Sequence, residues 1–173
     1  MPYNLFQGSL PGSIGNLSAL EQISLSNNKL TGIPKSLGQL SKLTVLDISE
    51  NMWEGVITET HLANLSSLKE VPNSFRFNKE STAKLTTNRF QGPLPLWSSN
   101  VTELYLGDNQ FSGPIPPSIG EVMPLLTDLD VSYNSLSGSI PLSIANITGL
   151  MNLVISNNEL SDNVDLGTAC GKY

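Results

Sequence analysis

The chain has 173 residues and a formal net charge of −6, with nine Lys and Arg against fifteen Asp and Glu. That length suits one domain, and the acidic balance argues against nucleic acid or an anionic membrane as a partner, because both attract clustered Lys and Arg. Leu, Ser and Asn fill 67 positions (27, 23 and 17), which is typical of a short motif copied many times.

One asparagine recurs along the chain at intervals of 24, 23, 37, 21, 25 and 24 residues. The repeats are centred on Asn4, Asn28, Asn51, Asn88, Asn109, Asn134 and Asn158. The surrounding pattern is L-x-x-L-x-L-x-x-N-x-(L/F)-x-G-x-(I/L)-P, as in VTELYLGDNQFSGPIP at 101–116 and LTDLDVSYNSLSGSIP at 126–141. This period predicts a solenoid in which each repeat makes one turn.

Each repeat starts with a short strand. The pair Leu104 and Leu106 places two apolar side chains on one face and the residue between them on the other. The Asn that follows turns the chain, and its amide both donates and accepts, so we expect a structural ladder formed by Asn28, Asn51, Asn88, Asn109, Asn134 and Asn158. The later Gly and Ile-Pro or Leu-Pro favour a close turn and an extended outer segment.

Three parts depart from the repeat. Asn4 opens the chain in mid-repeat, 58–82 is irregular, and 161–173 is a degenerate tail without a recognisable cap. The interval from Asn51 to Asn88 is eleven residues short of two repeats, which indicates a deletion near 69–71 or, alternatively, a native loop. We expect one solenoid domain over 1–173 that forms a segment of a longer protein, because solenoid ends normally carry caps.

The Gly-x-Ile-Pro extension after the Asn, together with GVITETHLANLSSLK at 55–69 and VPNSFRF at 71–77, resembles plant leucine-rich repeats, in particular the ectodomains of receptor-like proteins. The resemblance implies a right-handed leucine-rich-repeat solenoid with a concave parallel β-sheet and a convex side of extended or 3-10 segments. It also implies a defence or developmental receptor at the plasma membrane, acting through a co-receptor kinase. The chain itself carries no evident signal peptide or transmembrane segment.

Outward residues of the strands are the candidate binding surface for a protein or peptide ligand. Clustered carboxylates select a basic ligand, and Tyr supplies stiff contact area. The candidates on the concave and flanking face are Asp47, Glu50, Glu103, Tyr105, Asp108, Asp128, Asp130 and Tyr133. The alternative interpretation is ordinary solvated surface. The sequons at Asn16, Asn64, Asn100 and Asn146 predict glycosylation away from the strands in a secreted chain.

No catalytic constellation accompanies His61, the single histidine, or Cys170, the single cysteine. We interpret His61 as a surface or half-buried loop residue. The sequence therefore predicts a non-enzymatic module with no cofactor, no metal, and no contact of this segment with a membrane. Two alternatives stay open: a secreted inhibitor of the polygalacturonase-inhibitor type, and a truncated receptor without function of its own.

Overall fold

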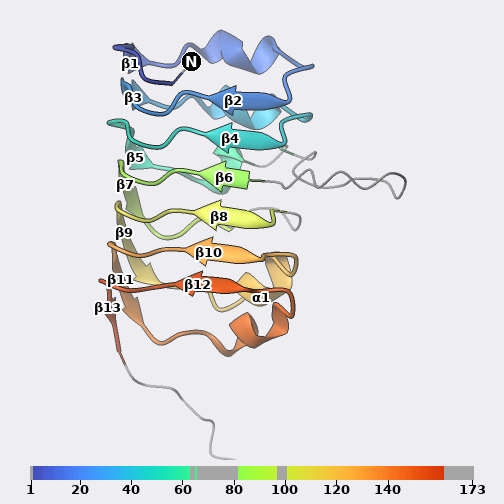
Figure 1. Ribbon diagram of the computed structural model, residues 1–173, viewed down its shortest axis with the longest axis vertical. Helices are drawn as coiled ribbons and strands as arrows, with labels where there is room; N and C mark the ends of the chain where they lie inside the picture. The colour runs from blue at the N-terminus through green and yellow to red at the C-terminus, as the bar shows by residue number, and fades with distance from the viewer. Residues whose placement is uncertain (1, 63–64, 66–81, 97–100, 162–173) are drawn as a thin grey trace, which may run out of the picture.

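The computed structural model describes residues 2–62, 65, 82–96 and 101–161, which form a stack of rungs around one apolar interior. The strands that precede the repeated Asn form a six-stranded parallel sheet in the order β2-β4-β6-β8-β10-β12 (Figure 1). Their bounds are Gln22–Ser24, Val45–Asp47, Thr82–Lys84, Glu103–Tyr105, Asp128–Asp130 and Asn152–Val154. The predicted leucine-rich-repeat solenoid with a parallel sheet is thus confirmed.

A second row of parallel strands follows the repeated Asn residues. It comprises the pair β1 and β3 and a five-stranded sheet in the order β5-β7-β9-β11-β13. Their bounds are Gln7–Ser9, Lys29–Gly32, Glu54–Val56, Arg89–Gly92, Gln110–Pro114, Ser135–Gly138 and Glu159–Leu160. These strands form the left flank of the stack in Figure 1.

Short helices occupy the side of the solenoid away from the six-stranded sheet, where extended or 3-10 segments were expected (Figure 1). The 3-10 helices are η1 (Gly12–Asn16), η2 (Lys35–Gln39), η3 (Glu59–His61) and η5 (Leu142–Asn146), and α1 spans Ile119–Val122. Pro11, Pro34 and Pro141 are the extended residues just before η1, η2 and η5. Within the described ranges, no helix has the length and apolar character needed to cross a bilayer.

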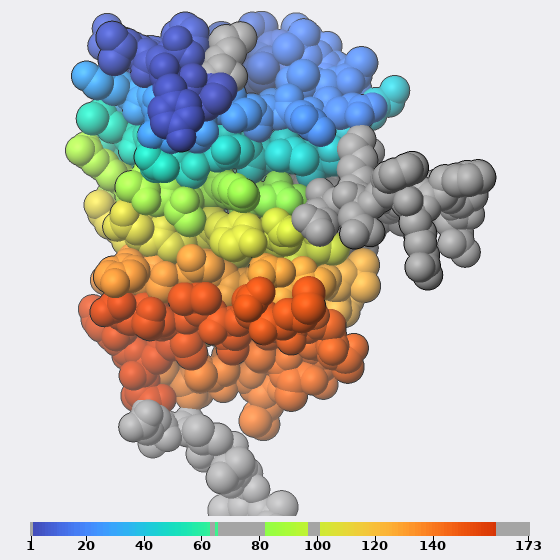
Figure 2. All heavy atoms as spheres, viewed as in Figure 1, coloured from blue at the N-terminus to red at the C-terminus, as the bar shows by residue number. Residues whose placement is uncertain are grey.

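The interior is a column of inward side chains, one set per rung. Leu46, Leu104 and Leu129 occupy matching strand positions and are at most 2% exposed. Phe90 and Phe111, two residues after their Asn, stack with ring centroids 6.2 Å apart. In Figure 2 the rungs are visible as coloured bands that are stacked in sequence order, each in contact with the next. The core is therefore shared only between neighbouring rungs.

The repeated Asn side chains form a continuous hydrogen-bonded ladder. Asn109 is typical: its Nδ2 donates to the carbonyls of Leu106 and Gly107 in its own rung and to that of Leu85 in the preceding rung, at 2.9 to 3.2 Å. Its Oδ1 accepts the N–H of Phe90 at 3.2 Å. The same donors and acceptors recur at Asn51, Asn88, Asn134 and Asn158.

The irregular interval between Asn51 and Asn88 occupies a single rung in the sheet. Strand β4 pairs directly with β6, so that Val45 lies opposite Thr82 and Asp47 opposite Lys84. The chain between them includes η3, while 66–81, where the deletion was predicted, and the tail from 162 onward lie outside the described residues. The sheet register consequently continues unbroken from β2 to β12.

Candidate functional site

The strand register aligns the outward residues of the six-stranded sheet into two columns, which we call the strand face. One column contains Ser24, Asp47, Lys84, Tyr105, Asp130 and Val154, and the other Gln22, Val45, Thr82, Glu103, Asp128 and Asn152. Because parallel strands lie about 4.8 Å apart, neighbouring members of a column are in reach of one ligand.

A third column follows each strand and has an unusual backbone. Its members are the residues just before the repeated Asn, and all are non-glycine residues with φ between 50° and 56°: Tyr3, Asn27, Glu50, Thr87, Asp108, Tyr133 and Asn157. This left-handed conformation costs an L-residue about 1–2 kcal/mol. It is held by hydrogen bonds to the next rung, as when the N–H of Asp108 donates to the carbonyl of Ser132 at 2.9 Å.

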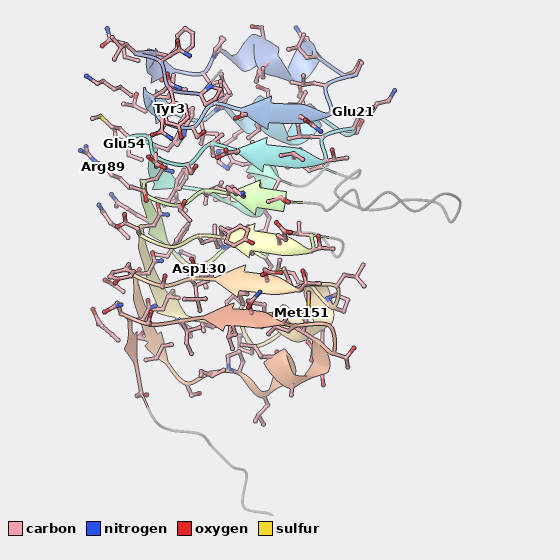
Figure 3. All side chains as sticks on the ribbon, viewed as in Figure 1. Tyr3, Glu21, Glu54, Arg89, Asp130 and Met151 are labelled. Atoms are coloured by element: carbon pink, nitrogen blue, oxygen red, sulfur yellow. The ribbon has the colours of Figure 1, made fainter. Side chains whose placement is uncertain are left out.

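Six of the eight predicted ligand-binding residues come together on two neighbouring rungs, those of β8 and β10. We call them the C-terminal patch: Glu103, Tyr105, Asp108, Asp128, Asp130 and Tyr133. Glu103 lies opposite Asp128 in the register, and Tyr105 lies opposite Asp130, which Figure 3 labels on this surface. The patch thus combines four carboxylates with two aromatic rings.

Several of these carboxylates are positioned by neighbouring polar side chains. Oδ1 of Asp130 accepts from the Oγ of Ser132 at 2.6 Å and from its N–H at 2.9 Å. Oδ1 of Asp128 accepts from Nδ2 of Asn152 at 2.5 Å, and Oε2 of Glu103 from Oγ1 of Thr82 at 3.0 Å. The sequence interpretation missed these partners, which hold the carboxylate groups in one orientation.

The other two predicted residues, Asp47 and Glu50, are separated from the C-terminal patch by the rung of β6. Lys84 stands between Asp47 and Tyr105 in the column, with its Nζ 5.6 Å from the Tyr105 ring centroid. Lys84 therefore separates the predicted carboxylates into two groups. Glu50 instead lines an open groove of about 690 Å³ that also includes Lys29.

The D-x-S pattern is the sequence signal that could have identified the serine partners of the aspartates. Asp47 accepts from both the N–H and the Oγ of Ser49, as Asp130 does from Ser132. By contrast, Asp108 and Tyr133 are exposed, Tyr133 by 61%, and the described residues give their side chains no hydrogen-bond partner. They are the most available contacts of the patch.

His61 does not lie at the surface, and our interpretation of it as a surface or half-buried loop residue is wrong. The side chain is 6% exposed, and its Nδ1 accepts the N–H of Thr58 at 3.1 Å and lies 3.0 Å from the Oγ1 of Thr58. Burial lowers the pKa of His61 below 6.5, and the positive charge of Lys35 adds to this shift. The ring thereby closes the first turn of η3.

Two of the four sequons lie on the helical side of the solenoid. Asn16 ends η1 and Asn146 ends η5, and both are exposed. Asn64 and Asn100 lie outside the described residues. Among those residues, no group of three or more His, Cys, Asp or Glu could hold a metal ion.

Family models for leucine-rich repeats match residues 3–52, 100–122 and 125–147. Receptor-like protein 18 of Arabidopsis thaliana is 37% identical over 163 residues, which cover 92% of this chain and 15% of that protein. The four curated relatives that match are all receptor-like proteins of that plant, and the aligned regions cover 9–15% of their lengths.

Solved structures give the same relationship. The ectodomain of the Arabidopsis receptor kinase HAESA, in complex with an IDA peptide hormone, superposes with a TM-score of 0.76 at 34% identity, over 91% of this chain and 25% of that one. A second structure contains HAESA with IDA and the co-receptor SERK1, with a TM-score of 0.62 at 28% identity, over 92% and 29% of the two chains.

Proposed function

Because this chain is a plant-type leucine-rich-repeat protein that resembles the ectodomains of receptor-like proteins, we propose that it recognises a peptide or protein ligand and catalyses no reaction. The observation that carries the proposal is the C-terminal patch. Four carboxylates and two tyrosines lie there on two adjacent rungs, on the paired strands β8 and β10 and just after them. A ligand that follows the sheet from rung to rung can contact all of them.

The ligand chemistry follows from the charges. Glu103, Asp108, Asp128 and Asp130 create a negative potential, which attracts Lys and Arg side chains. Tyr105 and Tyr133 add flat, rigid contact area at low entropic cost. The preferred ligand is thus an extended segment with positive side chains. Asp47 and Glu50 form a second subsite on the other side of Lys84. A ligand segment that reaches both subsites needs an acidic or neutral residue where it crosses Lys84.

The biological context rests on the relatives. The HAESA structures contain a peptide hormone, and one of them also contains a co-receptor. By analogy, this chain acts outside the cell in defence or developmental signalling, and a partner kinase carries the signal. Glycans at Asn16 and Asn146 would project from the helical side and leave the strand face open.

Titration calorimetry with a synthetic extended peptide tests the proposal. The peptide carries Lys or Arg at alternate positions, and its counterpart with Glu at those positions is the control. The double variant Asp128→Asn with Asp130→Asn retains the oxygens that accept from Asn152 and Ser132. We expect it to weaken binding of the basic peptide by about tenfold or more, and binding of the unmodified chain to weaken as salt rises.

Glu121→Gln provides the matched control. Glu121 is an exposed carboxylate on α1, so this variant removes charge away from the strand face. Its affinity should match that of the unmodified chain. If Glu121→Gln weakens binding as much as the double variant does, or if the acidic peptide binds equally well, the strand face is not the binding surface.

A further inference from the structure

The helical side of the solenoid has a groove between two neighbouring rungs. It has a volume of about 680 Å³ and lies between the segment that leads into α1 and the segment that leads into η5. The two helices contact each other, so the groove belongs to adjacent rungs (Figure 1). One wall includes Pro114 and Pro117, and the other includes Pro141, Leu142 and Asn146. Both walls are therefore parts of this chain.

The walls of this groove present apolar side chains to solvent. Leu142, the first residue of η5, is 71% exposed, and Pro114 and Pro117 on the opposite wall are exposed as well. Lys35 is the first residue of η2, which has a helix packed on each side, and it is likewise exposed. The exposure of Leu142 thus follows from its place within the rung. An occupant that covers Leu142 and the two prolines would remove this apolar surface from water.

Asn146 brings one specific modification to this groove. It is the acceptor residue of the sequon Asn146-Ile147-Thr148, in which Asn146 and Thr148 are exposed and Ile147 is buried. The N–H of Thr148 donates to the carbonyl of Asn146 at 3.0 Å, which holds the sequon in a turn. Within the described ranges, no group forms a hydrogen bond with the side chain of Asn146. Its amide is therefore accessible to N-glycosylation at the wall of the groove.

We propose that the first N-acetylglucosamine of a glycan on Asn146 lies in this groove and packs against Leu142. The proposal rests on the proposed function only for the passage of the chain through the secretory pathway. There, the donor is an oligosaccharide linked to a lipid diphosphate. The bond between sugar C1 and a diphosphate oxygen breaks, C1 bonds to Nδ2 of Asn146, and Nδ2 loses one proton. The lipid diphosphate leaves with the bonding electron pair.

Two physical reasons favour this occupant. One face of a pyranose ring carries mainly C–H groups, which pack on aliphatic side chains such as Leu142 and Pro117, while the hydroxyl groups at the ring edge stay in water. Attachment at the groove wall also gives the sugar a high effective concentration, so that a weak interaction is enough to keep it there. The sugar then contacts the rungs of α1 and η5 together and stabilises the folded state, while the rest of the glycan extends into solvent.

The test compares the chain with and without a single sugar on Asn146. The chain is secreted with a supplied signal peptide from a host that makes high-mannose glycans, and Gln replaces Asn at the other three sequons. An endoglycosidase then trims the Asn146 glycan to one N-acetylglucosamine, and Thr148→Ala provides the sugar-free form. We expect nuclear Overhauser effects between protons of the sugar and the methyl groups of Leu142. The sugar should also raise the melting temperature by about 2–3 °C.

Leu142→Ser isolates the contact with the sugar. Because Leu142 is 71% exposed, this variant should change the melting temperature of the sugar-free chain very little. In the Leu142→Ser background, the sugar should raise the melting temperature by less than about 1 °C. An equal rise with and without Leu142, or the absence of Overhauser effects to Leu142, would overturn the proposal.

The outcome is separable from that of the proposed function. If mass spectrometry finds Asn146 unmodified in the secreted chain, the sugar proposal is wrong, whereas the calorimetric test of the strand face is unaffected. Conversely, a strand face that binds no basic peptide leaves the contact between the sugar and Leu142 to be decided by the Overhauser effects and the melting temperatures.

Discussion

Asn109 illustrates how much a single side chain contributes to this molecule. One amide group satisfies three carbonyls and one N–H from two rungs, at 2.9 to 3.2 Å. Those backbone groups lie at a bend where the sheet ladders cannot pair them. The same arrangement recurs at the other repeated Asn positions, so the bend is specified by side-chain chemistry in every rung.

Replacing Asn109 with Ala should lower the free energy of unfolding by about 3 kcal/mol, because several partly buried backbone groups lose their partner at once. Denaturant unfolding followed by circular dichroism measures the change. Asn152→Ala is the control, since Asn152 is exposed and its side chain donates to Asp128 alone among the described residues. Equal losses in the two variants would contradict a structural ladder.

His61 predicts a specific pH dependence of stability. In the folded chain, burial lowers the pKa of the His61 ring below 6.5. The folded state therefore favours the neutral ring, and the unfolded state binds the proton more readily. The contribution to stability is full above pH 6.5 and is lost as the pH falls toward the folded-state pKa. Melting temperatures measured from about pH 8 to about pH 5 should show this decline.

The control for His61 is His61→Asn, whose side-chain oxygen also accepts from the N–H of Thr58 but does not titrate in this range. The variant should show a smaller decline of the melting temperature on acidification. An identical decline would assign the pH dependence to other groups. The sequence could not reveal the burial of His61, because η3 packs against η2, which belongs to the preceding rung.

At the scale of elements, the helical side depends on close approach between neighbouring rungs. Gly120 in α1 packs against η5, and its N–H donates to the Oγ of the buried Ser143 at 3.3 Å. A Cβ at Gly120 would overlap the backbone carbonyl of Ser143. The spacing between these two helices is therefore set by the absence of a side chain.

Gly120→Ala should destabilise the fold by about 1–3 kcal/mol, because the carbonyl of Ser143 belongs to a rigid backbone and must move. Gly149→Ala serves as the control, since the nearest atom to its added Cβ is 3.8 Å away, at the carbonyl of Leu126. Thermal unfolding of the two variants provides the comparison. A melting temperature for Gly120→Ala equal to that of Gly149→Ala would refute the close contact.

At the scale of the whole molecule, the repeat made the fold predictable. The alternation of Leu104 and Leu106 predicts a strand with one inward face, and the constant interval between Asn residues predicts that these strands stack in register. The candidate site was only partly predictable. The columns, with Lys84 between Asp47 and Tyr105, follow from the repeat. The hydrogen bonds from Thr82 to Glu103 and from Asn152 to Asp128 join different rungs, and no local pattern encodes them.

The left-handed residues that precede each Asn also bear on how such a protein evolves. Tyr, Asn, Glu, Thr and Asp all adopt nearly the same φ at these positions, so the backbone conformation does not depend on which side chain is present. Mutations in this row can therefore change the chemistry of the rim with little effect on the shape that displays it. Natural selection can vary specificity here, one rung at a time, while the architecture persists.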